Sequence, residues 1–133
     1  AGAPPPAEPN DASVTLLVRT GGLTVLLPGD LEPPAQRALL TAVPRLPRVD
    51  ALKVPHHGSA YQDHELLRRL GPRFALVSAG TGNPYGHPSP RTVAALRAQG
   101  AAVLRTDEHG PLALTAEVDG EEKRAPAVTL GGK

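Results

Sequence analysis

The sequence predicts one layered α/β domain, in which an antiparallel hairpin leads into a mixed sheet flanked by helices. Three observations support this fold class. The chain has 133 residues, which is enough for one small core and leaves little length for a second. Short apolar runs of strand length alternate with segments of helical periodicity. Frequent Pro and Gly residues separate these segments, and the sequence contains no internal repeat.

The first half of the chain contains a predicted hairpin and one predicted helix. Residues 1–9 form a Pro-rich lead-in that is typical of a linker. Apolar residues alternate from Ser13 to Arg19, and a turn with two glycines leads to a second run at Leu23 to Leu27. We therefore expect a hairpin with one buried face. Residues 33–43 place Ala and Leu at helical spacing behind two prolines, which indicates an amphipathic helix.

The middle of the chain is expected to form two strands with a helix between them. The apolar run from Ala51 to Val54 predicts a short strand that ends at Pro55. Asp63 is a predicted N-cap for a helix ending near Leu70, and residues 74–78 resume as a strand.

The last third is expected to contain one more helix and two strands. Ser89 followed by Pro90 predicts a helix start, and this helix should end near Gly100. Strands are expected at 102–104 and 111–118, and residues 119–133 are expected to be a flexible tail.

Composition excludes several classes of site. The chain has no Cys, so any metal must be held by His and carboxylate groups. Lys and Arg total 14 against 13 Asp and Glu, which gives no basic field that would by itself indicate nucleic acid. The longest apolar runs are far shorter than the roughly 20 residues of a membrane-spanning helix. We expect a soluble piece of a longer protein.

Polar groups follow three of the predicted strands directly. They are Asp30, the pair His56 and His57, and the segment 83–87. Because strand ends in α/β sheets collect at one edge, these groups are expected to form one site. A carboxylate can bridge two metal ions and neutral imidazole is a good terminal ligand. The alternatives are that Asp30 is a turn residue that caps the next helix and that the histidines are structural.

Four segments of the chain form a distinctive set. They are Asn-Asp-Ala-Ser-Val (10–14), Val-Leu-Leu-Pro-Gly-Asp (25–30), Leu-Lys-Val-Pro-His-His-Gly-Ser (52–59) and Asn-Pro-Tyr-Gly-His-Pro (83–88). In this order they closely resemble the metallo-β-lactamase-like domain of ComEC-type DNA-uptake competence proteins. The resemblance extends over about residues 10–115, and we assign residues 10–118 to this domain. It implies the C-terminal half of an αββα sandwich, placed in the extracytoplasmic part of a bacterial cell-membrane protein.

The resemblance implies a centre of two divalent ions, Zn or Mn, that activates water against a phosphodiester. Such a nuclease is thought to degrade the DNA strand that is not imported. Asp30 matches the bridging aspartate. The following ligand matches His56 or His57, and His56 is favoured because related proteins place this ligand directly after a strand and a small residue. His57 would then contact the metal ligands from outside the centre, or contact the substrate.

The resemblance also implies a loop that faces the substrate. Ser59, Asn83, Tyr85 and His87 match positions of that loop, and His87 would donate a proton to a phosphate oxygen or leaving group. The catalytic set implied is therefore Asp30, His56, His57 and His87. Lys53 lies on the strand before the histidines. It is either a further member of this site or a residue on a solvated face, and the solvated face is favoured.

The chain departs from the family pattern in two ways. No His- and Asp-rich block resembling the first metal motif precedes Asp30, and Pro28 stands where such sequences often have Thr. With one carboxylate and two or three imidazoles, we expect weak metal binding and little catalysis by this chain alone. The intact domain is the expected enzyme.

Three partners are expected from the resemblance and the half-sandwich fold. They are single-stranded DNA, the rest of a polytopic membrane channel protein, and a second copy of this chain, because half a sandwich leaves a sheet face or edge without its partner.

Two other functions remain open. One is another hydrolase of the same fold, similar to phosphorylcholine esterases or lactonases. The other is a non-catalytic DNA-binding or structural module, although a content of 2% aromatic residues leaves little stacking surface.

Overall fold

The computed structural model describes residues 9–119 and 123–131, and its centre is a five-stranded sheet. The first two strands pair antiparallel as the predicted hairpin, and the following strands add in parallel. The sheet is therefore mixed, as predicted. In spatial order the strands are β1 (Leu16–Thr20), β2 (Leu23–Leu27), β3 (Ala51–Lys53), β4 (Phe74–Val77) and β5 (Ala102–Arg105).

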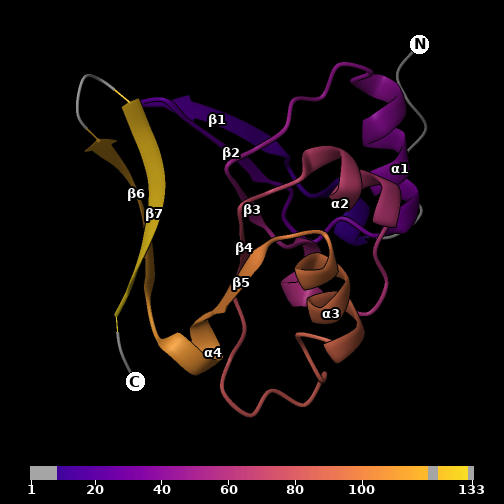
Figure 1. Cartoon of the computed structure of the whole chain (residues 1–133). Helices are drawn as coiled ribbons and strands as arrows, with labels where there is room; N and C mark the ends of the chain where they lie inside the picture. Colours follow the sequence, from indigo (N-terminus) through magenta and orange to yellow (C-terminus); the bar gives the residue numbers. More distant parts are fainter. Residues whose placement is uncertain (1–8, 120–122, 132–133) are drawn as a thin grey trace.

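Three helices cover one face of this sheet (Figure 1). They are α1 (Pro33–Ala42), α2 (His64–Leu70) and α3 (Pro90–Ala98). A short helix α4 (Thr106–His109) follows β5, and 3₁₀ turns form at Pro9–Ala12 and Pro55–Gly58. Among the described residues, no helix is both long and apolar enough to cross a membrane.

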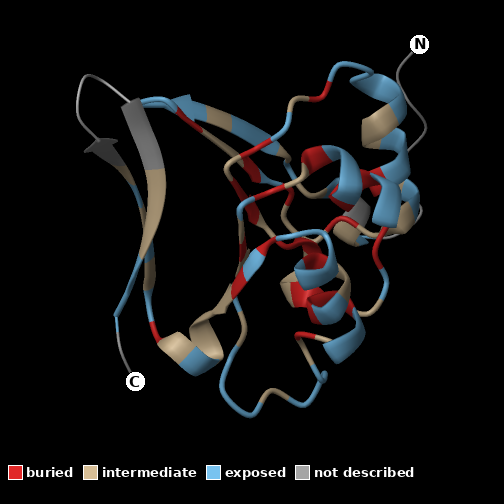
Figure 2. Ribbon diagram, viewed as in Figure 1, coloured by how far each residue is buried: buried red, intermediate tan, exposed pale blue. Residues whose placement is uncertain are grey.

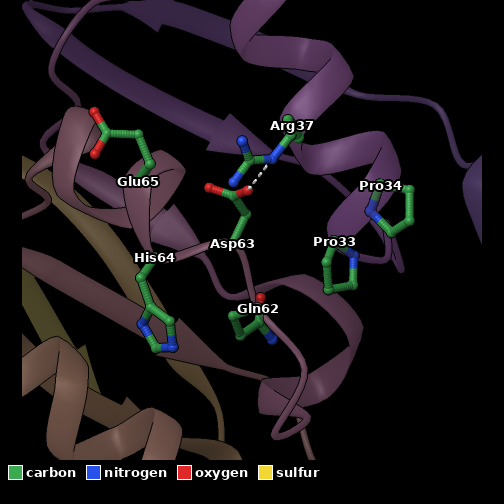
Figure 3. A pocket seen from close by; sticks show the side chains of 7 residues that line it. All are labelled: Pro33, Pro34, Arg37, Gln62, Asp63, His64 and Glu65. Carbon is green, nitrogen blue, oxygen red and sulfur yellow. Dashed lines mark ion pairs between the residues drawn. The ribbon is translucent and has the colours of Figure 1, made fainter.

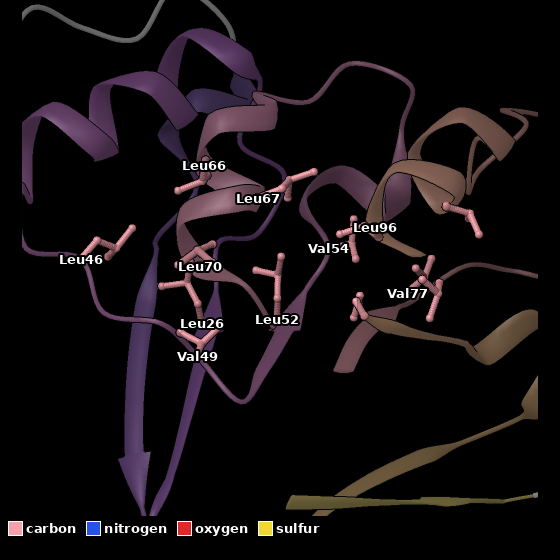
Figure 4. Packing of buried hydrophobic residues seen from close by; sticks show 14 residues of the cluster. Leu26, Leu46, Val49, Leu52, Val54, Leu66, Leu67, Leu70, Val77 and Leu96 are labelled. Carbon is pink, nitrogen blue, oxygen red and sulfur yellow. The ribbon is translucent and has the colours of Figure 1, made fainter. Parts of the chain in front are cut away.

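The core lies between the helices and the sheet (Figure 2). Leu26 of β2 and Leu52 of β3 project toward Leu66, Leu67 and Leu70 of α2, as Figure 4 shows. All five side chains are almost completely buried. This packing fixes α2 over the two strands whose ends carry the predicted site.

The ends of α2 agree with the sequence prediction. The Asp63 carboxylate accepts a hydrogen bond from the Leu66 backbone N–H at 3.0 Å, which satisfies one of the free donors of the first turn. Gly71 ends the helix with a left-handed φ of 48°.

The hairpin prediction is confirmed for strand pairing and wrong for burial of β1. β2 buries Leu23 and Leu26, whereas β1 has no buried residue. β1 is the edge strand, so it has a neighbour on one side only. Leu16 of β1 and its register partner Leu27 of β2 are 52% and 37% exposed.

Two further strands form a separate antiparallel ribbon, β6 (Leu112–Asp119) and β7 (Lys123–Leu130). In Figure 1 this ribbon stands on the side of the large sheet opposite the helices. β6 matches its prediction, but β7 lies in the segment that was expected to be a flexible tail. Residues 123–130 form a strand because the long edge of β6 is available for pairing. Pro126 is tolerated inside β7 because a strand of a two-stranded ribbon pairs on one side only. Residues 120–122 and 132–133 of that segment lie outside the described residues.

We expect the exposed apolar edge to make this chain self-associate. In sedimentation equilibrium at high concentration, the wild-type chain should form dimers or larger species, because aggregation of apolar edge strands removes their side chains from water. The double variant Leu16→Lys/Leu27→Lys should shift the chain to monomer. A control that adds the same charge at exposed helix positions, Ala38→Lys/Ala98→Lys, should not. A wild-type chain that stays monomeric would contradict this expectation.

Candidate functional site

The chain makes an uncommon backbone turn directly after β3. His56 and His57 have φ values of 49° and 56°, and Gly58 follows with 79°. The left-handed region is unfavourable for residues with a Cβ, and such conformations persist only where neighbours enforce them. This strained turn, residues 55–59, therefore indicates a functional constraint on the two histidines.

Buried side chains hold the strained turn from behind. The Gln62 amide donates hydrogen bonds to the Pro55 and Ser59 carbonyl oxygens at 2.9 and 3.1 Å. The Gln62 carbonyl accepts one from Gln36 of α1 at 3.0 Å. The Thr92 hydroxyl of α3 donates to the Ser59 carbonyl at 2.6 Å. The turn is thus tied to two helices.

The loop from Asn83 to Pro88 packs against the strained turn. A Cβ on Gly58 would lie 2.7 Å from the Pro88 Cβ, and the Ser89 N–H donates to the Gly58 carbonyl at 2.7 Å. This close approach brings His87 to His56, with ring centroids 5.4 Å apart.

Asp30 reaches the same place from the end of β2. Its N–H donates to the Ser13 hydroxyl at 3.1 Å, and the His56 N–H donates to the Gly29 carbonyl at 3.0 Å. These bonds place Asp30 Oδ1 at 3.4 Å from His57 Nε2. The structure therefore brings the ends of β2 and β3 together, as the sequence predicted.

The His57 ring is held by a second contact. Its Nδ1 lies 2.7 Å from the Ser78 carbonyl oxygen. Because a carbonyl can only accept, Nδ1 carries the proton, and Nε2 is the ring nitrogen that faces Asp30 Oδ1. Metal-binding histidines commonly have this arrangement, with one nitrogen bound to a carbonyl and the other left to the ion.

His56 turns to a different carboxylate. Its Nδ1 forms an ion pair with Glu32 Oε1, and the Asn10 amide donates to the same oxygen at 3.4 Å. The buried Nδ1 has no aligned hydrogen bond within the described part of the chain, although it contacts Glu32 Oε1. Glu32, Asn10 and Ser13 had no predicted role in the site. The signal that could have identified Glu32 is its two-residue spacing from Asp30.

Lys53 corrects an expectation. Its side chain is 23% exposed instead of facing solvent, and Nζ lies 3.2 Å from the Gly29 carbonyl and 3.8 Å from Asp30 Oδ1. The strand alternation correctly places Lys53 away from the core, but the Gly29 turn covers that position. Burial lowers the pKa of Lys53, and the Asp30 carboxylate offsets part of this.

The substrate-loop residues have different surroundings. Ser59 is buried and its hydroxyl donates to the Tyr61 carbonyl at 3.2 Å. The Asn83 amide donates to the Gly80 and His87 carbonyls, and its oxygen accepts from the His87 N–H. Both side chains support loops in this structure. Their predicted contacts with substrate stay predictions.

Tyr85 and His87 stack on each other. Their ring centroids are 6.0 Å apart with planes 19° apart, and Tyr85 is 78% exposed. Burial, followed by the charges of His56 and His57, lowers the pKa of His87. His87 is therefore mostly neutral at pH 7, and its protonated fraction rises as the pH falls.

The donors near Asp30 match a divalent metal by type. Asp30 and His57 converge, and carboxylate with imidazole suits Zn or Mn. Within residues 9–119 and 123–131, no group of three or more His, Asp or Glu side chains is assembled for a metal ion. The assignment of Asp30, His56 and His57 as ligands stays a prediction.

Another cavity lies away from these histidines. It measures about 640 Å³ and opens between α1 and α2 (Figure 3). Three of its polar residues already have partners, because Arg37 pairs with Asp63 at 3.2 Å, Asp63 caps α2 and Gln62 supports the strained turn. A cavity of about 190 Å³ opens at the histidines themselves.

Comparison with known proteins finds relatives among competence proteins. The chain is 38% identical over 111 residues to ComE operon protein 3 of Bacillus subtilis (83% of this chain, 14% of that protein). It is 32% identical over 106 residues to competence protein ComA of Neisseria gonorrhoeae (79% and 15%). It is 33% identical over 102 residues to recombination protein 2 of Haemophilus influenzae (76% and 13%).

These matches support the resemblance to ComEC-type competence proteins. The chain spans about one seventh of the length of the relatives it matches. No family model matches the chain. No solved structure matches it significantly.

The contact between Gly58 and Pro88 gives a stability prediction. Gly58→Ala adds a clash with Pro88 to the strain of a left-handed alanine. Gly82→Ala is the matched control, since Gly82 has a φ of 67° with open space around it. In urea unfolding we expect Gly58→Ala to lose about 1–3 kcal/mol more than Gly82→Ala. Equal losses would show that the two loops are not tightly packed.

The support from Gln62 gives a second prediction. Gln62→Leu keeps the side-chain size and leaves the Pro55 and Ser59 carbonyls without this buried donor. The free energy of unfolding should fall by about 1–3 kcal/mol, because the Pro55 carbonyl is left unsatisfied whereas the Ser59 carbonyl keeps its bond from the Thr92 hydroxyl. Gln99→Leu, at an exposed position, should change it by about 0.5 kcal/mol or less. An unfolding midpoint of Gln62→Leu equal to that of this control would contradict the assignment.

Proposed function

We propose that this chain is part of a metal-dependent phosphodiester hydrolase domain, with nuclease activity on single-stranded DNA, in a DNA-uptake protein. The observation that supports it most is the pairing of His57 Nε2 with Asp30 Oδ1 at 3.4 Å, made by a backbone turn that is strained at both histidines. The similarity to competence proteins supports the same conclusion.

Asp30 and His57 are the residues proposed to hold the metal. The Ser78 carbonyl fixes the His57 proton on Nδ1, so Nε2 is available as a ligand beside the carboxylate. His56 turns toward Glu32, which favours His57 over His56 as the ligand. When bound, two divalent ions would supply Lewis acidity and a hydroxide nucleophile near neutral pH. The remaining ligands would come from outside the described residues.

Lys53 and His87 are proposed to assist. Lys53 places a positive charge beside Asp30, where a phosphate would approach, and it holds the Gly29 turn through the carbonyl. His87 lies beside His56 and would exchange a proton with the leaving group. Because its pKa is lowered, proton donation by His87 should strengthen as the pH falls toward that pKa.

The role in the whole protein is proposed from the relatives. Degradation of the strand that is not imported, attachment to a polytopic membrane channel and an extracytoplasmic location would follow if the parent protein resembles the competence proteins throughout. An esterase or lactonase with the same fold is the alternative hydrolase, and its substrates distinguish it from a nuclease.

A structural role for the cluster is the second candidate. Each carboxylate already has a cationic or imidazole partner, since Asp30 contacts Lys53 and His57 while Glu32 contacts His56. Such a cluster would stabilise the turn without any ion. Metal-dependent activity distinguishes the two candidates.

We expect a longer protein that includes the upstream metal motif to cleave single-stranded DNA with Mn²⁺ or Zn²⁺. Asp30→Ala should abolish cleavage, and His87→Ala should slow it by roughly 10²–10⁴ if His87 transfers a proton. His64→Ala, at an exposed helix position, is the control and should leave the rate unchanged. The 133-residue chain alone should show little activity.

A fluorescent oligonucleotide assay with matched phosphorylcholine and lactone substrates measures this prediction. Strong cleavage by the short chain, or full activity of the longer Asp30→Ala variant, would show that the site is misassigned. Hydrolysis of an ester or lactone in place of DNA would support the alternative hydrolase.

A further inference from the structure

A small cavity opens beside the Asp30–His57 pair. It has a volume of about 190 Å³ and is lined by His57, Ala79, Gly80, Asn83, Tyr85 and His87. Pockets that enclose a whole drug-sized ligand measure about 300–1,000 Å³. This cavity therefore has room for one flat ring system and not for a whole nucleotide.

The rings at this cavity form a stacking platform. The Tyr85 and His87 planes differ by 19°, and His87 in turn contacts His56 edge-on. Tyr85 is 78% exposed, although large aromatic side chains gain most from burial. A flat apolar surface at the mouth of a cavity is the surface on which nucleobases stack.

The platform is held in place before any ligand binds. The Asn83 amide donates to the Gly80 carbonyl at 2.9 Å and to the His87 carbonyl at 2.7 Å. Its oxygen accepts from the His87 N–H at 3.1 Å. A preorganised loop loses little conformational entropy on binding, which favours affinity.

We propose that this cavity binds one nucleobase of a single-stranded nucleic acid, stacked on the Tyr85 ring. The proposal rests on the proposed function, because His57 lines the cavity and also contacts Asp30. A base held there would place its sugar-phosphate beside Asp30 and Lys53. The Asn83 side-chain amide already makes its hydrogen bonds within the loop. The base is therefore held by stacking, and the chemical identity of the base matters little.

Binding without cleavage tests this proposal separately from the hydrolase proposal. The probe is a short labelled oligothymidylate, with a matched strand of abasic residues, measured by fluorescence anisotropy in EDTA. Tyr85→Ala should weaken oligothymidylate binding roughly 5- to 150-fold, whereas Tyr85→Phe should keep most of the affinity. Tyr61→Ala is the control, because Tyr61 is 73% exposed outside the cavity.

The abasic strand identifies the base as the ligand. It should bind the wild-type chain about as weakly as oligothymidylate binds Tyr85→Ala, and Tyr85→Ala should not distinguish the two strands. An equal loss in Tyr61→Ala, equal binding of both strands by the wild type, or no binding by the wild type would overturn the proposal. Absence of cleavage with this binding pattern intact would overturn only the hydrolase proposal.

Discussion

The strained turn after β3 is the constraint on which the site depends. Two successive left-handed residues with side chains cost about 1–3 kcal/mol each, so their neighbours must enforce them. The buried Gln62 amide and the Thr92 hydroxyl do this through the loop carbonyls, because those carbonyls would otherwise be buried without partners. The turn sends the two imidazoles to different carboxylates, His57 to Asp30 and His56 to Glu32.

The charges around Asp30 are nearly balanced without an ion. Lys53 and His57 contact the Asp30 carboxylate, and burial disfavours the charged form of Lys53. An ion bound at Asp30 would therefore compete with the Lys53 ammonium for the same carboxylate. Under the proposed function, Lys53 would move toward a phosphate as the ion takes its place. Under the same proposal, this competition and the small number of donors would both weaken metal binding by this chain.

Local signals in the sequence predict much of the fold. Asp63 and Gly71 mark the ends of α2, and the rule that polar groups gather at strand ends brings Asp30 to the histidines. The missed features depend on contacts between distant segments. The sequence alternation places Lys53 off the core, but only the fold shows that the Gly29 turn covers it. Gln36, a polar residue on the buried face of α1, joins the support of the turn by bonding to Gln62.

The exposed apolar edge and the Asp30 carboxylate are neighbours in space. Leu27, which is partly exposed beside Leu16, ends the strand that leads through Gly29 to Asp30. A segment that covered these leucines would therefore arrive beside the Asp30 carboxylate. If that segment carried the remaining metal ligands, the same packing step would bury the apolar edge and complete the proposed metal centre. The free energy of burying Leu16 and Leu27 would then contribute to metal affinity. Packing would already hold the ligands in position, so metal binding would not have to supply the free energy of ordering them.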